Sequence, residues 1–308
     1  MPHVEPDILL SIIAPAHNEE GNVAPLVREI EQAMQALDAK GEAWEFILVD
    51  DGSTDGTLGA ATTLLPDHPR LRIVKMRHTP AGRGHGQSAA THAGIRASRG
   101  RFIATLDADL QNDPADLPRM MATLRDTQAD LVQGDRSGKR RDTLVRRASS
   151  VISRWFRVLL LNDPTVDTGC CIRVMTRQLA LSLPLEFRGQ HRFVPFTTRS
   201  MGLKVVEHPV NHRPRVSGQA KYGIWNRALP GLIDCFAVRW MRRRRRPVAF
   251  DAITMPETVR AEGPVSRQPS AIGHQQTTDN RQPITDDLRP GAPRAALRTM
   301  PSAPADAP

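Results

Sequence analysis

Short apolar runs alternate with helical patterns over the first 110 residues of the chain. Runs with the length and composition of buried strands are found at Leu9–Ala14, Phe46–Val49, Leu71–Met76 and Phe102–Leu106. Between them, apolar residues recur every three or four positions, which predicts helices at Val23–Leu37, Thr57–Leu65 and Gln87–Ser98. Strands and helices in this order favour an α/β fold with a mainly parallel sheet and helices on both faces.

The pattern is less regular beyond the fourth strand. Helices are predicted at Pro114–Asp126 and Ser149–Leu161, and strands at Asp130–Gln133, Thr168–Met175 and Val205–Val210. The adjacent Cys170 and Cys171 fall inside one of these strands, which favours a role as small core residues.

The C-terminal part of the chain changes character twice. Residues 223–250 combine tryptophan and aliphatic residues with charges, Pro230 is expected to kink any helix there, and Arg242–Arg246 follow without interruption. Residues 251–308 contain no aromatic residue and 9 of the 25 prolines, so they cannot bury enough apolar surface to offset their ordering entropy. We therefore divide the chain into a globular domain at 1–222, an amphipathic segment at 223–250 and a disordered tail at 251–308.

Composition narrows the possible functions only partly. The 308 residues are 40% hydrophobic and 24% charged, which is typical of a soluble globular protein. A net charge of +9 fits nucleic acid, an anionic membrane surface or phosphorylated substrates. Three cysteines form neither a disulfide framework nor a metal-binding spacing, which indicates a reducing compartment. With no signal-peptide pattern and no run of 18 apolar residues, a cytoplasmic location is expected.

Polar clusters follow three of the predicted strands. The clusters are Pro15–Glu19, Asp50–Asp55 and Asp107–Asp109. Any one of them is more often a turn or a helix cap than a site. Three clusters at the carboxyl edge of one parallel sheet, however, would meet in a single crevice. Oxygen ligands such as the Asp107–Asp109 pair suit Mg²⁺ or Mn²⁺, which keep room for substrate phosphates.

The same clusters resemble glycosyltransferase family 2, whose fold is the GT-A fold. The segments Gly86–Ala90, Gly134–Arg136, Thr168–Arg173 and Arg215–Tyr222 narrow the resemblance to dolichol-phosphate mannose synthases and bacterial undecaprenyl-phosphate sugar transferases. The resemblance extends from about Ile8 to Met241. Ala220 stands where the family usually has serine before the late lysine.

The resemblance implies an inverting, metal-dependent transfer from a GDP- or UDP-linked sugar to a polyprenyl phosphate. Its motifs imply binding of the base and ribose by Pro15, His17, Glu19, Asp50 and Asp51. They imply a Mg²⁺ or Mn²⁺ site at Asp107, Asp109 and Gln111, with Asp109 also counted as catalytic.

The acceptor phosphate is already an anion near neutral pH, since its second pKa is about 6, and needs no strong general base. Cations are needed instead, to bring two anionic groups together. The candidates are the catalytic Arg136, Arg215 and Lys221, with Arg146 and the neutral donor Ser150 as further phosphate-binding residues. His191 is a candidate for proton transfer, although a lone histidine is more often structural.

A lipid acceptor gives the basic C-terminal segment a function. Residues 223–250 are too polar to span a membrane, but they are suited to lie in its interface with Arg242–Arg246 on anionic lipid. We therefore expect a peripheral protein on the cytoplasmic face. The sequence leaves the sugar, the nucleotide and the oligomeric state open.

Two alternatives remain. A transferase acting on a hydroxyl group of a glycan or lipid would need an additional carboxylate base, and Glu186 and Glu207 have no predicted place in the site. A nucleic-acid-binding protein would explain the charge but not the three acidic clusters, because acids in a groove repel phosphate backbones. Binding of nucleic acid is therefore not expected.

Overall fold

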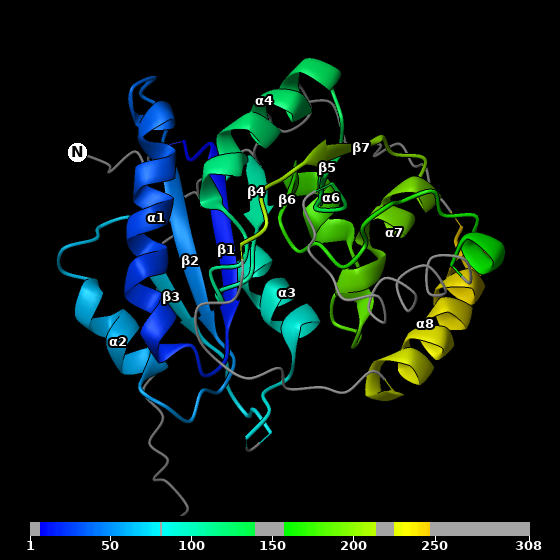
Figure 1. Ribbon diagram of the computed structural model, residues 1–308, viewed down its shortest axis with the longest axis horizontal. Helices are drawn as coiled ribbons and strands as arrows, with labels where there is room; N and C mark the ends of the chain where they lie inside the picture. The colour runs from blue at the N-terminus through cyan, green and yellow to red at the C-terminus, as the bar shows by residue number, and fades with distance from the viewer. Residues whose placement is uncertain (1–6, 81, 139–156, 214–224, 247–308) are drawn as a thin grey trace, which may run out of the picture. The chain divides into compact units, whose positions relative to one another are not determined.

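Figure 1 shows the computed structural model, which describes residues 7–80, 82–138, 157–213 and 225–246. The side chains of residues 225–230 are not described. All described residues belong to one compact unit, Met1–Pro247. The predicted tail at 251–308 and the boundary at residue 222 lie outside the described residues.

A seven-stranded sheet in the order β3-β2-β1-β4-β6-β5-β7 forms the centre of the fold (Figure 1). The strands are β1 Leu10–Ala16, β2 Trp44–Asp50, β3 Leu71–Lys75, β4 Phe102–Thr105, β5 Leu131–Asp135, β6 Arg173–Thr176 and β7 Val205–Pro209. The pairs β1–β2, β1–β4, β2–β3 and β5–β7 are parallel. Among the described strands, β6 alone is antiparallel to its neighbours, β4 and β5. The predicted α/β fold with a mainly parallel sheet is confirmed.

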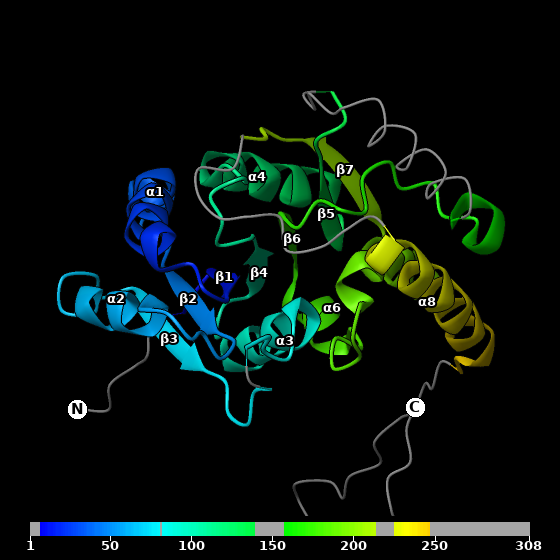
Figure 2. The ribbon, with the colours of Figure 1, turned by 60° about the horizontal axis from the view of Figure 1, so that its bottom comes forward.

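Helices cover both faces of the sheet, as Figure 2 shows. Because side chains alternate between faces along a strand, Leu10, Ile12 and Ala14 share one core with α1 (Glu20–Asp38) and α4 (Leu117–Thr127). Ile13 belongs to a second core with α3 (Gln87–Ala97) and α6 (Arg177–Ser182). The helices are α1 Glu20–Asp38, α2 Thr57–Leu64, α3 Gln87–Ala97, α4 Leu117–Thr127, α6 Arg177–Ser182, α7 Val194–Ser200 and α8 Trp225–Arg244. Two short 3-10 helices, η1 Pro114–Asp116 and η2 Gln190–Phe193, precede α4 and α7.

A third, smaller core attaches α8 to the rest of the unit. Cys235 and Val238 of α8 are buried with Leu161, Phe193 and Phe196. Residues 157–161 are helical, whereas most of the predicted helix Ser149–Leu161 lies outside the described residues. The helix α8 runs through Pro230, where the sequence predicted a kink.

The start of one strand in the second half, and with it the setting of two cysteines, differs from the sequence-based prediction. The strand predicted at Thr168–Met175 begins only at Arg173, so Cys170 and Cys171 lie in the preceding loop. Cys170 is buried, as expected of a core residue, but Cys171 is only half-buried, so its assignment to the core was wrong. The prediction failed because apolar residues of this segment pack in a loop, and a hydrophobic pattern alone does not distinguish such a loop from a strand.

Candidate active site

The polar clusters converge at the carboxyl edge of the sheet. The end of β1 pairs with the end of β2 at Ala16 and Asp50, and Ile13 of β1 pairs with Thr105 of β4. The backbone N–H of Asp51 donates to the carbonyl of Ala16 over 2.9 Å, and His17 Nδ1 donates to the carbonyl of Asp51 over 2.9 Å. The predicted convergence of the strand-end clusters is therefore present in the structure.

The first two clusters contact each other directly, since the backbone N–H of Asn18 donates to Ser53 Oγ over 3.1 Å. The backbone N–H of Glu19 donates to Thr57 Oγ1 over 2.8 Å, and Glu19 itself accepts from the Asn22 amide over 2.6 Å. Asp50 is almost fully buried and accepts the backbone N–H of Ser53 over 3.2 Å. The structure places Pro15, His17, Glu19 and Asp50 at one edge, as predicted, although their role in binding base and ribose stays a prediction.

Asp51 has a structural task that the sequence did not reveal. Its two carboxylate oxygens accept the backbone N–H groups of His85 and Gly86, over 2.8 Å and 2.7 Å. Gly84, with φ +59°, passes so close that a Cβ there would lie 2.4 Å from the Asp51 carboxylate. Asp51 thus holds the glycine-containing loop that precedes α3 against the end of β2.

The pair Asp107 and Asp109 follows β4. Asp109 is buried and accepts the backbone N–H of Gln111 over 3.2 Å, and Asp107 is half-buried and accepts the side-chain amide of Gln87 over 2.6 Å. Burial and the charge of Asp109 raise the pKa of Asp107 to about 6, because nearby arginines do not compensate fully. Gln111 also accepts the backbone N–H of Arg213 over 2.9 Å.

This donor set fits a divalent cation that shares its coordination with a substrate. Within the described ranges, no group of three or more His, Cys, Asp or Glu side chains is arranged to hold a metal. Mg²⁺ and related hard cations commonly bind through one or two carboxylates plus substrate phosphates. A cation between Asp107 and Asp109 would also relieve the repulsion that raises the pKa of Asp107.

The predicted cationic side of the site is only partly described. Arg136 is buried and makes a bidentate ion pair with Asp167, over 2.7 Å from Nε and 3.1 Å from Nη2. Burial opposes the charge, but the hydrogen bonds to Asp167 prevail and raise the pKa of Arg136. The other predicted phosphate-binding residues lie outside the described residues; they are Arg146, Ser150, Arg215 and Lys221.

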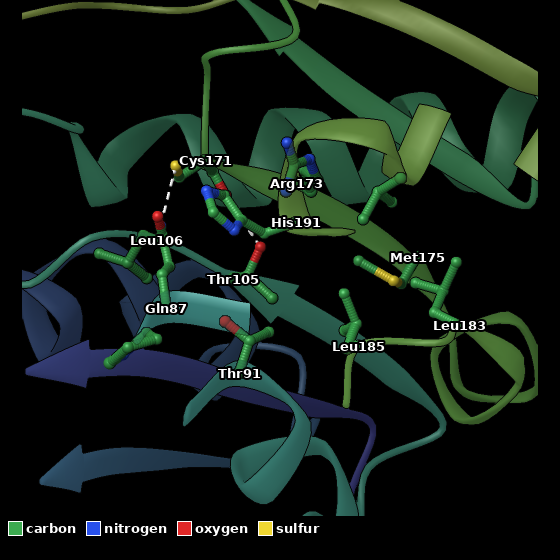
Figure 3. A pocket seen from close by; sticks show the side chains of 12 residues that line it. Gln87, Thr91, Thr105, Leu106, Cys171, Arg173, Met175, Leu183, Leu185 and His191 are labelled. Atoms are coloured by element: carbon green, nitrogen blue, oxygen red, sulfur yellow. Dashed lines mark hydrogen bonds between the residues drawn. The ribbon is translucent and has the colours of Figure 1, made fainter. Parts of the chain in front are cut away.

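His191 lies beside a small cavity between α3, β4 and η2 (Figure 3). Its Nδ1 hydrogen-bonds to Ser88 Oγ over 2.8 Å. Burial, together with the charges of Arg192 and Arg173, lowers the pKa of His191 to about 3, so the imidazole is neutral at physiological pH. The cavity of about 10 Å³ holds roughly one water molecule. His191 is therefore unsuited to donate a proton at neutral pH.

Two glutamates that the sequence left without a place have partners elsewhere. Glu207 accepts the backbone N–H of Val166 over 3.0 Å and lies 3.8 Å from Arg199, and Glu186 lies 3.7 Å from His92. These contacts do not favour either glutamate as a base for a hydroxyl acceptor.

The sequence also missed residues that organise the site. Gln87, Ser88 and Asp167 each contact a predicted site residue or His191. Gln87 and Ser88 belong to the segment Gly86–Ala90, which carried the resemblance without a role for its members. No pattern in the sequence indicated Asp167.

Comparison with known proteins agrees with this geometry. The family model described as glycosyl transferase family 2 matches residues 11–180. Dodecaprenyl-phosphate galacturonate synthase of Rhizobium johnstonii is 35% identical over 245 residues, 78% of this chain and 70% of the relative. Undecaprenyl-phosphate 4-deoxy-4-formamido-L-arabinose transferase of Aeromonas hydrophila is 29% identical over 76% of this chain and 69% of the relative.

Solved structures share the fold. Glucosyl-3-phosphoglycerate synthase from Mycobacterium tuberculosis, in complex with Mn²⁺, UDP and glucosyl-3-phosphoglycerate, matches with a TM-score of 0.56 at 19% identity, covering 76% of this chain and 80% of that one. A mannosyltransferase from Pyrobaculum calidifontis, in complex with GDP-Man and Mn²⁺, matches with a TM-score of 0.56 at 20% identity. The match covers 78% of this chain and 66% of that one. The fold is thus GT-A-like, as the resemblance implied.

Proposed function

Because the chain belongs to glycosyltransferase family 2, we propose that it transfers a sugar from a nucleotide-diphosphate sugar to a polyprenyl phosphate, with inversion at the anomeric carbon. The observation that carries this proposal is the convergence of the three polar clusters at one sheet edge, in a chain similar to enzymes named for polyprenyl-phosphate products. The product would be a lipid-linked sugar.

For the donor, we propose that base and ribose lie along the ends of β1 and β2. The residues are Pro15, His17, Glu19, Asp50 and Asp51. Contacts between the two clusters, such as that of the Asn18 backbone N–H with Ser53 Oγ, would fix these groups before the nucleotide arrives. A preformed site loses less conformational freedom on binding and binds more tightly.

For the metal, we propose Mg²⁺ or Mn²⁺ at Asp107 and Asp109, with Gln111 adjoining them. The bound cation would offset the charge that develops on the departing diphosphate. The protein contributes two carboxylates held one residue apart, and a cation between them would screen Asp107 from the charge of Asp109.

For the acceptor, we propose that arginine and lysine side chains bind the phosphate whose oxygen attacks the sugar. Asp167 accepts from Nε and Nη2 of Arg136, and an arginine carries five N–H donors, so Arg136 retains donors for a phosphate oxygen. The remaining proposed residues are Arg146, Ser150, Arg215 and Lys221. Because the phosphate is already ionised, this arrangement needs binding groups rather than a base.

We further propose that the enzyme works peripherally on the cytoplasmic face of an anionic membrane. No helix within the described part of the chain is long and apolar enough to cross a membrane. On α8, however, Ile233, Phe236 and Trp240 are 59%, 55% and 61% exposed, and their spacing places them along one side of the helix. Exposed arginines follow directly at residues 242–246. An apolar stripe with an adjoining basic run suits binding in the interface plane.

The proposal is tested with the purified full chain, liposomes that contain undecaprenyl phosphate, and a panel of radiolabelled GDP- and UDP-sugars. We expect label to enter the organic phase with one donor, in a reaction that needs Mg²⁺ or Mn²⁺. The variant Asp109→Asn is the matched negative control. Absence of lipid-soluble label with every donor, while the protein is folded, would contradict the proposal.

A further inference from the structure

Three consecutive residues at the beginning of α3 each contact a different part of the candidate site. Gly86 contacts Asp51 at the end of β2, Gln87 contacts Asp107 after β4, and Ser88 contacts His191 in η2. These three partners are far apart in the sequence. A short segment therefore joins the proposed nucleotide and metal sides to η2.

The first contact fixes where α3 begins. Gly86 has φ +94°, a conformation that favours glycine. Its backbone N–H donates to Asp51 over 2.7 Å, next to that of His85 over 2.8 Å. Two hydrogen bonds to one carboxylate hold the helix start at a set distance from β2.

The second contact fixes Asp107. The side-chain amide of Gln87 donates to Asp107 Oδ1 over 2.6 Å and to Cys171 Sγ over 3.0 Å. Figure 3 shows Gln87 and Cys171 side by side at the edge of the small cavity. The segment around Cys171 is itself held, because Thr105 Oγ1 donates to the Cys171 carbonyl over 2.8 Å. The Gln87 amide thus lies between a proposed metal ligand and a fixed loop.

The third contact is the least exposed. Ser88 is buried, and its Oγ hydrogen-bonds to His191 Nδ1 over 2.8 Å and accepts the backbone N–H of His191 over 3.1 Å. With both hydrogen bonds to one residue, Ser88 holds η2 against α3. The neutral His191 is therefore part of the same support.

We propose that Gln87 is a positioning residue that sets the orientation of Asp107 toward the metal, within a support formed by Gly86, Gln87 and Ser88. This inference rests on the proposed metal site at Asp107 and Asp109. Groups that hydrogen-bond to a metal ligand fix its orientation, and their loss typically costs about 10–100-fold in metal affinity or activity. The side-chain amide of Gln87 contacts Asp107 and Cys171, so we expect its effect on the metal to pass through Asp107.

The test measures how much Mn²⁺ strengthens nucleotide binding. Dissociation constants of UDP and of GDP are measured by calorimetry, with and without Mn²⁺, for the wild-type chain and for Gln87→Leu. We expect Gln87→Leu to reduce the Mn²⁺-dependent gain in affinity by about 10–100-fold, with metal-free affinity unchanged. Gln35→Leu, on the exposed side of α1, is the matched control and should leave both values unchanged.

A second variant guards against misfolding. Gln87→Met keeps the length of the side chain but removes the amide that donates to Asp107, so it should lose the Mn²⁺-dependent gain as well. If Asp109→Asn abolishes the gain while both Gln87 variants, folded by thermal melting in EDTA, stay within twofold of wild type, the positioning role is wrong and the metal site stands. If wild type shows no Mn²⁺-dependent gain with either nucleotide, the metal site and this inference are both wrong.

Discussion

The proposed donor half and acceptor half of the site treat charge in opposite ways. At the donor half, Asp51 accepts backbone N–H groups and Asp107 accepts a neutral amide, and Asp107 retains a raised pKa. At the acceptor half, the charge of Arg136 is matched by Asp167.

This difference shows at which half of the site a bound ligand can compensate the charge of the protein. An anionic cluster without full compensation favours a cation, whereas the Arg136–Asp167 pair is already balanced within the protein. A substrate phosphate must therefore be met by the remaining donors of Arg136 and by further cations. Four predictions test this contrast, beginning with the largest expected effect.

Asp109→Asn should reduce transfer by on the order of 10³-fold or more, since a metal contributes several kcal/mol of charge stabilisation. The side chain keeps its size, so the fold should persist. Initial rates at saturating Mn²⁺ measure the effect, and Asp126→Asn, an exposed position on α4, is the control. Activity within a few-fold of wild type would remove the anionic cluster from the reaction.

Breaking the balanced pair should instead affect stability. Arg136→Met and Asp167→Asn should each lower the free energy of unfolding by about 3–5 kcal/mol, because each leaves a buried group without its partner. The double variant should lose less than the sum of the two. Urea unfolding measures all three. Single variants that cost under about 1 kcal/mol, with a raised KM for the acceptor, would show that Arg136 acts mainly on phosphate.

Asp107→Asn should make the metal-free protein more stable at pH 7 although it destroys activity. The folded-state pKa of about 6 exceeds the ordinary 3.8, so ionisation of Asp107 destabilises the fold as pH rises through this range. The gain at pH 7 should be about 3 kcal/mol at most and should vanish below about pH 4. Unfolding in EDTA at pH 4 and pH 7 measures this gain in the free energy of unfolding. An equal gain at both pH values would show that it does not arise from the charge of Asp107.

Removal of arginine charges at the end of α8 is expected to have the smallest of the four effects at physiological salt. Arg242 already donates to the Leu161 carbonyl over 3.0 Å, so it should be kept. Changing the exposed Arg243, Arg244 and Arg246 to glutamine should weaken binding to anionic liposomes by about 3 kcal/mol at low salt. Sedimentation measures this, with glutamine at the exposed Arg28, Arg96 and Arg101 as the charge-matched control. Equal loss in both variants would indicate attraction by net charge rather than by α8.

The donor half was predictable from sequence because its elements are local. The strands β1, β2 and β4 each end in a polar cluster, and neighbouring parallel strands share an edge, so the sequence predicted correctly that Asp50 and Asp107 lie at one edge of the sheet. The contact of Gln87 with Asp107 spans 20 residues and its contact with Cys171 spans 84, and no periodicity encodes such pairs.

The acceptor half was harder to predict for a related reason. The antiparallel β6 lies between β4 and β5, and its first residue is the buried Arg173, which donates to Gln133 over 2.6 Å. A buried arginine at a strand start has no signature in a hydrophobic pattern, so the strand was placed too early. Likewise, the sequence shows the charge of Arg136 but not its partner, Asp167, and the role of Arg136 in binding phosphate stays a prediction.

The central claim is that the acceptor is a phosphate. The most direct measurement compares undecaprenyl phosphate with undecaprenol in the same liposomes, with the donor sugar that the panel identifies, and follows the lipid product by mass spectrometry. The account predicts a sugar–phosphate–lipid product with undecaprenyl phosphate and no product with undecaprenol. An ionised phosphate needs no base, whereas an alcohol does, and the contacts of Glu186 and Glu207 do not favour either as that base. Equal or faster transfer to undecaprenol would contradict it.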